Sequence, residues 1–239
     1  KAKALDKQDQ LHHFADLFYT PQDKNGHPLL YFCGNSLGLQ PKITADYVQQ
    51  ELEDWKNLGV KGHTQAKNPW MPYHEFLAHP MAKIVGAKPQ EVVMMNTLSV
   101  NLHLMMVSFY QPEAKRYKVV IEKDAFPSDR YAVESQLKYH NIDPQEGLVL
   151  WEPDAKTGYY SRESFEQLIA QQGEEIALVM IGSPNYYSGQ AFDLQHLVQT
   201  AKAKDCKVGF DLAHGAGNIQ PNLHQVEADF AVWCSYKYL

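Results

Sequence analysis

Two polar residues near the C-terminal end of the chain suggest a definite chemistry. Asp211 follows the apolar run VGF, and Lys237 follows the run DFAVWC by a few residues. A carboxylate at the end of a buried strand is costly unless a cation faces it, and a protonated pyridine nitrogen is one such cation. A lysine at a desolvated strand end can lose its proton and form an imine with an aldehyde cofactor. Taken alone, Asp211 is more often a helix cap and Lys237 a solvated loop lysine, but together they are the pairing that pyridoxal-phosphate chemistry requires.

Two further segments carry groups that such a cofactor would need, and one of them lies at the same expected edge of the sheet. Ser99 lies in NTLSVNLHLMM at the start of an expected helix, where free N–H groups and the helix dipole favour a phosphate. Ser is also a common N-cap, so capping alone is the simpler alternative. The segment DAFPSDRY follows the strand-like YKVVIE, so Phe126 can stack on a planar ring. Asp129 can accept a hydrogen bond from that ring or cap the helix that follows.

The elements that position these residues form an α/β pattern. Residues 1–20 and 41–58 have apolar residues at helical spacing and form an N-terminal helical arm and segment, which we place at 1–59. Beyond residue 91, short β-rich runs alternate with helices around DRYAVESQLKYH and LQHLVQTAKAKD. These runs are VVMM, VNLHLMMVSFY, YKVVIE, ALVMIG, KVGFDLA and DFAVWC. The alternation is typical of a mainly parallel sheet covered by helices, so we assign 60–239 to one large α/β domain.

Composition excludes several other classes of protein. A formal net charge of -6 with scattered Lys and Arg gives no basic face for nucleic acid. Neither a membrane span nor a secretory signal is visible, and Cys33, Cys206 and Cys234 form no CxxC pair, so we expect a cytoplasmic protein in a reducing compartment. The two histidines of HEFLAH lie five residues apart rather than four, so we expect no metal site. HGAGN lacks the third glycine of a dinucleotide-binding turn.

Seven segments, in order along nearly the whole chain, resemble the kynureninases, a family within the aminotransferase class V group of fold type I pyridoxal-phosphate enzymes. They are YFCGNSLGLQPK at 31–42, GHTQAKNPW at 62–70, NTLSVNLHLMM at 96–106, FPSD at 126–129, YYSGQAFD at 186–193, VGFDLAHGAGN at 208–218 and DFAVWCSYKYL at 229–239. The resemblance implies a mainly parallel, seven-stranded-type sheet in the cofactor-binding large domain. The chain lacks an initial Met and stops soon after an apparent strand, so we expect this domain to be incomplete at its C-terminal end, with a small C-terminal domain outside the chain.

The resemblance also implies a cofactor site. Its expected residues are Leu98, Ser99, Phe126, Pro127, Ser128, Asp129, Asp211, His214, Tyr236 and Lys237. Within this set, Lys237 would carry pyridoxal 5'-phosphate as a Schiff base and Asp211 would face the pyridine nitrogen. Tyr236 would contact the phosphate and serve as an acid in later proton transfers. Ser36 and His63 fall where the family contacts the aromatic end of the substrate.

The activity implied by the resemblance is hydrolysis of L-kynurenine or 3-hydroxy-L-kynurenine to L-alanine and anthranilate or 3-hydroxyanthranilate, by a homodimer, in tryptophan breakdown and NAD synthesis. One departure is the end of ALVMIG, where the family commonly has Ser or Thr and this chain has Gly182 followed by Ser183. Two alternatives stay open. One is another class V enzyme such as a cysteine desulfurase, although Tyr236 stands where a desulfurase usually has His. The other is a non-catalytic fragment.

Overall fold

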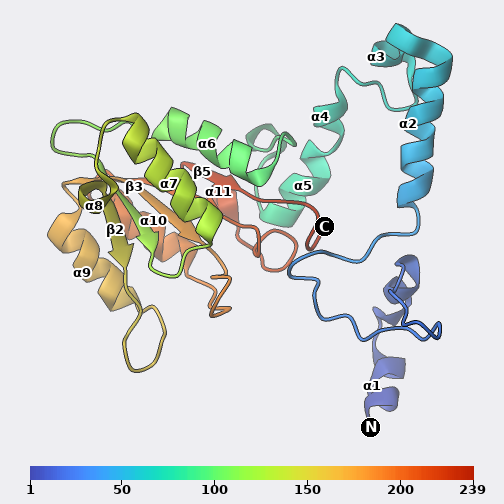
Figure 1. The fold of residues 1–239 in the computed structure, drawn as a ribbon, viewed down its shortest axis with the longest axis horizontal. Coiled ribbons are helices and arrows are strands. Elements are labelled where there is room, and N and C mark those ends of the chain that lie inside the picture. Colours follow the sequence, from blue (N-terminus) through green and yellow to red (C-terminus); the bar gives the residue numbers. More distant parts are fainter. The chain divides into compact units, whose positions relative to one another are not determined.

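The computed structural model describes residues 1–239, which divide into two compact units, Lys1–Phe76 and Leu77–Leu239. The first unit is helical, as expected of an N-terminal arm (Figure 1). Its elements are α1 (Ala2–Gln8), η1 (His12–Leu17), α2 (Thr44–Leu58), η2 (Gly59–Lys61), α3 (Gly62–Gln65) and α4 (Tyr73–Phe76). The division along the chain falls between residues 76 and 77, and the expected domain boundary at residue 59 stays a prediction.

Two helix boundaries in the first unit differ from expectation. The helix expected over residues 1–20 is interrupted at Asp9, whose side chain accepts a hydrogen bond from the Leu11 N–H at 2.9 Å. An Asp that binds the backbone two residues on competes with continued helix, so a separate 3-10 turn follows. The expected helix from Pro41 begins only at Thr44, because Pro41 pairs with Phe18 in an isolated β-bridge.

The second unit alternates helices with strands. Its helical elements are α5 (Ala78–Val85), η3 (Pro89–Glu91), α6 (Leu98–Phe109), α7 (Pro127–Tyr139), α8 (Pro144–Gly147), α9 (Arg162–Gln172), α10 (Leu194–Lys202) and α11 (Leu223–Val226). Its strands are β1 (Lys118–Glu122), β2 (Leu148–Trp151), β3 (Ile176–Gly182), β4 (Lys207–Asp211) and β5 (Phe230–Val232). No helix of the chain combines the length and the hydrophobicity that crossing a membrane requires.

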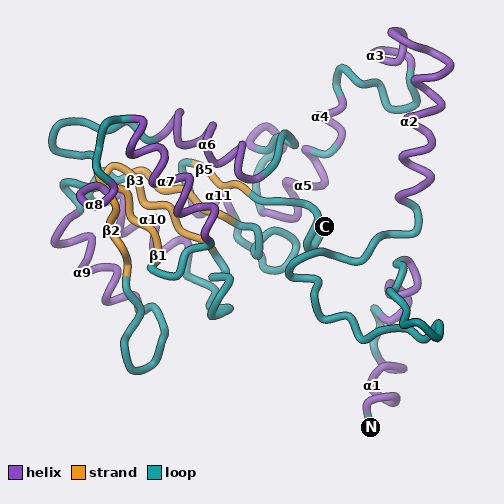
Figure 2. The backbone as a smooth tube through the Cα atoms, viewed as in Figure 1, coloured by secondary structure: helices purple, strands orange, loops and turns teal.

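The five strands form one sheet in the order β2-β1-β3-β4-β5, and every neighbouring pair is parallel (Figure 2). The prediction of an α/β fold with a parallel sheet is therefore confirmed. The sheet has five strands rather than the seven expected. The expected run VVMM is not a strand. Val92 has extended backbone, but residues Val92–Met95 pair with no neighbouring strand. A strand needs a partner that takes its backbone hydrogen bonds.

The two faces of the sheet are covered by different helices. Val119 and Ile121 of β1 pack in one apolar cluster with α6 and α7. Val120, between them, packs in a second cluster with α9 and α10. Successive side chains of a strand point to opposite faces, so a run that is apolar at every position needs this double cover.

The chain reverses its direction of travel across the sheet at β1. From β1 it passes to β2 on one side, and from there back to β3 on the other side of β1. In open parallel sheets, such a switch point leaves a crevice at the carboxyl ends of the two strands, where ligands bind. Glu122 is the last residue of β1 and Gly182 the last of β3, so the topology directs attention to these two residues.

Three elements were misjudged from the sequence. The run VNLHLMMVSFY, which we assigned to the β-rich runs, is the body of helix α6, so that assignment is wrong and only the helix expected to begin near Ser99 is confirmed. An apolar run without clear periodicity is ambiguous between a strand and a buried helix. Helix α6 gives such a run because it is apolar on most of its sides. Strand β2 was missed because it has four residues, and helix α9 because its sequence is mostly polar.

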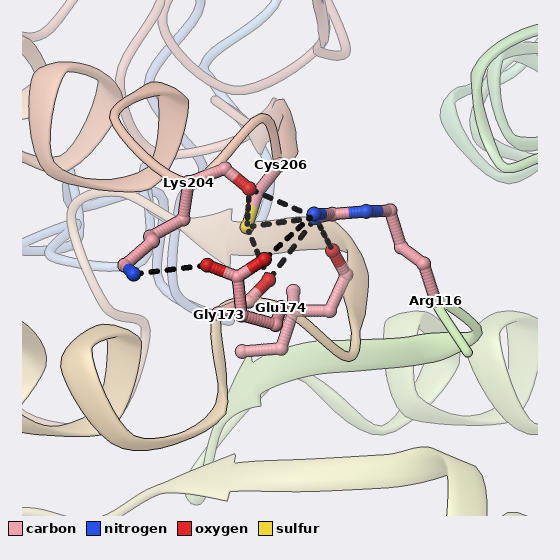
Figure 3. A network of polar contacts seen from close by, with 6 residues as sticks. Arg116, Gly173, Glu174, Lys204 and Cys206 are labelled. Carbon is pink, nitrogen blue, oxygen red and sulfur yellow. Dashed lines mark hydrogen bonds and ion pairs between the residues drawn. The ribbon is translucent and has the colours of Figure 1, made fainter.

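The amino ends of the strands are joined by Arg116, which precedes β1 (Figure 3). Its Nη1 donates to the carbonyl oxygens of Gly173, Ile176 and Lys204 at 3.0, 2.8 and 2.9 Å. These carbonyls belong to the end of α9, the start of β3 and the turn after α10. One guanidinium thus satisfies backbone acceptors from three connections, at the edge of the sheet opposite the switch point.

We expect Arg116→Ala to lower the free energy of unfolding by about 3 kcal/mol, because it leaves partly buried carbonyls without their donor. The matched control is Arg162→Ala, which breaks an ion pair with Asp193 whose two side chains are 63% and 40% exposed. Exposed pairs of this kind contribute less than about 1 kcal/mol. Urea unfolding of the full-length protein measures both variants, and equal losses would contradict the role given to Arg116.

Candidate active site

A cavity of about 270 Å³ opens at the carboxyl ends of the strands in the second unit. Its walls come from the end of each of β1, β3 and β4, from the start of α6 and α7, and from the loop after β5. The lining residues are Leu98, Ser99, Glu122, Phe126, Ser128, Asp129, Gly182, Pro184, Tyr186, Asp211, Ala213, His214, Tyr236 and Lys237. The cavity lies where ligands bind in sheets of this topology.

The structure brings together nine of the ten residues expected at the cofactor. Pro127 is the exception, since it is the first residue of α7 and does not line the cavity. Its fixed φ suits the first turn of a helix, which accounts for its place. Ser36 and His63 belong to the first unit, where both are exposed, and their predicted contact with substrate stays a prediction.

Lys237 lies in the turn after β5 with its ammonium directed at two rings. Its Nζ is 3.3 Å from Nε2 of His214 and 6.0 Å from the centre of the Phe126 ring. Burial, and then the nearby lysine, lower the pKa of His214, so the imidazole is neutral near pH 7. Nε2 then accepts from Lys237, while Nδ1 donates to the Tyr238 hydroxyl at 3.1 Å. His214 therefore orients the lysine without adding positive charge.

Asp211 ends strand β4 and is only 6% exposed. Its Oδ1 accepts a hydrogen bond from the Ala213 N–H at 2.6 Å. Burial raises the pKa of Asp211, whereas a hydrogen bond from Asp129 favours its charged form. Burial and the Asp211 charge raise the pKa of Asp129 to about 9. Near neutral pH, Asp129 is therefore the protonated partner and Asp211 the one that carries negative charge.

This protonation has a consequence for cofactor-free protein. The pKa of Asp129 is about 9 in the folded state against 3.8 ordinarily, so the folded protein holds a proton that the unfolded chain releases. Stability therefore falls as pH rises between these values, by up to about 1.4 kcal/mol per pH unit. Asp129→Asn removes this dependence, so we expect the variant to gain stability relative to wild type from pH 5 to pH 8. Thermal unfolding at several pH values measures the difference, and a difference independent of pH would contradict a protonated Asp129.

The start of α6 faces the cavity with Leu98 and Ser99, the first two residues of the helix. Thr97 is the N-cap and makes no side-chain capping bond, so the alternative in which Ser99 caps the helix is wrong. The Asn101 N–H is the first to find a backbone acceptor, the carbonyl of Thr97. Free amides and the dipole of a twelve-residue helix favour an anion such as a phosphate at this position.

Aromatic side chains form the mouth of the cavity. Phe126 is 45% exposed and meets Tyr186 edge to face, with ring centres 5.1 Å apart. The exposed face of Phe126 is free to stack on a planar ligand. Tyr236 is also exposed, and a hydrogen bond with Cys234 raises the pKa of its hydroxyl.

Sequence reasoning missed several lining residues, of which Glu122 and Tyr186 carry polar groups. Glu122 ends an apolar run in the same way as Asp211, and this signal could have identified it. The departure at Gly182 is resolved in part, because the glycine lines the cavity and Ser183 does not. The Ser183 hydroxyl instead accepts a hydrogen bond from the Phe192 N–H at 3.2 Å.

Comparison with known proteins identifies close relatives by sequence. The chain is 53% identical over 238 residues to kynureninase from Myxococcus xanthus, a match that covers 100% of this chain and 56% of the relative. It is 47% identical over 235 residues to kynureninase from Koribacter versatilis, covering 98% of this chain and 55% of the relative. The predicted resemblance to kynureninases is confirmed. The chain spans little more than half the length of these curated relatives.

Solved structures with the same fold are more distant in sequence. A cysteine desulfurase from Thermococcus onnurineus has a TM-score of 0.65 at 20% identity, covering 87% of this chain and 50% of that one. A mutant of C-DES with glycine covalently linked to its pyridoxal-phosphate cofactor has a TM-score of 0.75 at 12% identity, covering 96% and 56%. The family model for "Aminotransferase class-V" matches residues 30–239. With this match over most of its length, the chain belongs to the class V aminotransferase family.

Proposed function

We propose that this chain is part of a kynureninase, which hydrolyses L-kynurenine or 3-hydroxy-L-kynurenine to L-alanine and anthranilate or 3-hydroxyanthranilate with pyridoxal 5'-phosphate. The observation that carries the proposal is the identity of about half to curated kynureninases over the whole chain. The cavity adds chemical support, because it brings Lys237 and Asp211 to one edge of the sheet.

The lining residues fit this cofactor. Lys237 is the one lysine or arginine among them, and it shares the cavity with three buried acidic residues: Glu122, Asp129 and Asp211. Such a cavity lacks positive charge, and a protonated pyridine ring next to Asp211 would supply it. Phe126 would stack on the ring, and the free amides at the start of α6 would hold the phosphate.

When bound, pyridoxal phosphate supplies an electron sink for the electrons left by removal of the substrate's α-proton. Lys237 Nζ would hold the cofactor through its aldehyde group and, when free, would take the proton from the α-carbon of the substrate. Neutral His214 orients Nζ for this transfer through its Nε2. The hydroxyl of Tyr236, at the mouth of the cavity, holds a proton that can be returned later in the reaction.

The main rival within the family is cysteine desulfurase activity. The similarity to solved desulfurases is at 20% identity or less and concerns the fold alone. Kynureninase is favoured by the relatives at 46–53% identity. The test is to give L-kynurenine to the full-length protein with cofactor and to record anthranilate release by fluorescence. Release of anthranilate supports the proposal, whereas release of sulfide from L-cysteine without anthranilate would replace it by the desulfurase assignment.

We also propose that the full-length protein is a cytoplasmic homodimer that acts in tryptophan breakdown. The support is the kynureninase assignment, since enzymes of this fold commonly complete each active site with a second copy. A mass measurement on the full-length protein in solution tests the dimer. A monomer that hydrolyses kynurenine would refute the dimer and leave the activity standing.

A further inference from the structure

Glu122 occupies the switch point of the sheet, where the carboxyl ends of β1 and β3 lie side by side. It is the last residue of β1, it is 2% exposed, and its side chain lines the cavity. Both of its carboxyl oxygens accept from the backbone N–H of Gly182, the last residue of β3, at 3.1 Å. A side chain of β1 thus clasps the end of β3 directly beneath the place where a ligand binds in this topology.

A side chain at position 182 would displace the carboxyl of Glu122 from its present position. A Cβ added there would lie 2.8 Å from Oε1 of Glu122, closer than real Cβ contacts come. The carboxyl of Glu122 therefore fills the space that a side chain at the end of β3 would take. Glu122 and Gly182 form a matched pair. Glu122 provides the carboxyl group, and Gly182 provides the N–H donor and the space left by its missing side chain.

The surroundings of Glu122 link it to Asp211. Facing it are Asp211 from β4, Asp129 from the start of α7, Asn185 from the loop after β3 and Tyr160 from the segment before α9. Burial, with a smaller contribution from the Asp211 charge, raises the pKa of Glu122 to about 7, against the lowering effect of the Gly182 hydrogen bonds. Its charge and that of Asp211 therefore depend on one another.

We propose that Glu122 is a positioning residue of the cofactor site, which clasps β3 beneath the cavity and, through Asp211, sets the negative charge offered to a cationic ring. The proposal rests on the proposed function, because it takes the ring to be that of pyridoxal phosphate. A charged Glu122 strengthens the hold of Asp211 on a protonated pyridine nitrogen. When Glu122 is neutral, Asp211 alone attracts the protonated pyridine nitrogen.

Glu122→Gln separates charge from clasp, since the amide oxygen still accepts from Gly182 but the side chain never ionises. We expect cofactor affinity of the full-length variant to equal wild type within about twofold at pH 6 and to be about tenfold weaker at pH 8.5. Glu122→Asp retains the carboxyl but is too short for the clasp, so its affinity should be lowered at both pH values. The matched control is Glu152→Gln, which removes an exposed carboxylate that follows β2 at the same edge and pairs with Lys123. Its affinity should match wild type throughout.

Titration of cofactor-free protein with pyridoxal phosphate, followed by absorbance, measures these affinities. Equal affinity of Glu122→Gln and wild type at both pH values would overturn the proposal, and so would weakening that is the same at pH 6 and pH 8.5.

A cofactor-free arm separates this proposal from the proposed function. Without cofactor, Glu122→Gln should gain thermal stability relative to wild type as pH rises from about 4.5 to about 7 and keep that gain above 7, because over this range the folded wild type holds a proton that the unfolded chain has released. The absence of this gain would overturn the linkage between Glu122 and the acidic cluster. If wild-type protein binds no pyridoxal phosphate, the proposed function fails, and so does the role of Glu122 toward a ring, whatever this arm shows.

Discussion

The Lys237→Ala variant is expected to lose the visible absorbance of lysine-bound pyridoxal phosphate and to hydrolyse kynurenine at least about 10³-fold more slowly than wild type. Both effects are expected together, because under the proposed function the same nitrogen would bind the cofactor aldehyde and take the α-proton. No other lysine lines the cavity, so none stands ready to replace it. Absorbance spectra and kcat/KM of the full-length variant measure both effects.

Lys138→Ala is the matched control for this substitution. Lys138 lies in the last turn of α7, is exposed, and is not among the residues that line the cavity. Its replacement should leave the spectrum and kcat/KM within about twofold of wild type, as is usual for an exposed side chain. If Lys237→Ala kept the cofactor absorbance and more than a tenth of the activity, the proposed anchor would be wrong.

Asp211→Asn is expected to lower kcat/KM about 100-fold, which corresponds to about 3 kcal/mol for the loss of a buried charge-assisted hydrogen bond. Asparagine can still accept from the Ala213 N–H, so the turn after β4 should survive. Under the proposed function, the variant loses the negative charge that would keep a pyridine nitrogen protonated and the ring a strong electron sink. Steady-state kinetics with L-kynurenine measure the loss, and circular dichroism checks the fold.

A control for charge alone is Asp143→Asn. Asp143 caps the short helix α8 by accepting from the Gln145 N–H, and asparagine is an equally good cap. This variant should retain full activity. Activity of Asp211→Asn within threefold of wild type would mean that no protonated ring depends on Asp211.

Much of the cofactor site could be predicted because parallel sheets expose their chemistry at strand ends. Asp211 and Lys237 each follow an apolar run, and a polar side chain in that place is informative. Phe126 and Ser99 follow from the same logic, and Ser99 occupies the second position of helix α6 rather than its N-cap. The resemblance to a family then joined these positions into one site.

Glu122 was missed for a physical reason. It is followed by Lys123 and Asp124, and three charged residues in a row resemble a solvated turn. The strand order shows that β1 and β3 are neighbours at a switch point. Because they are neighbours, the carboxyl of Glu122 reaches Gly182 and the cavity. Strand order depends on contacts between distant segments and is not encoded in any local pattern.

The elements that escaped prediction share a weak local signal. Helix α6 is apolar on most sides, so its sequence lacks the period that separates helix from strand. Val92–Met95 has the composition of a strand, but strand structure also requires a neighbour with free backbone groups. Composition alone could not show that this neighbour is missing from the sheet described.

The attachment of the cofactor to Lys237 is the central claim and can be measured directly. The full-length protein with pyridoxal phosphate is reduced with borohydride, which makes a lysine-bound cofactor permanent, and is then digested and analysed by mass spectrometry. We predict that the cofactor mass is found on the peptide that contains Lys237, in a yield close to one per chain. Recovery of the label on a different lysine, or of no labelled peptide from protein that hydrolyses kynurenine, would contradict the account.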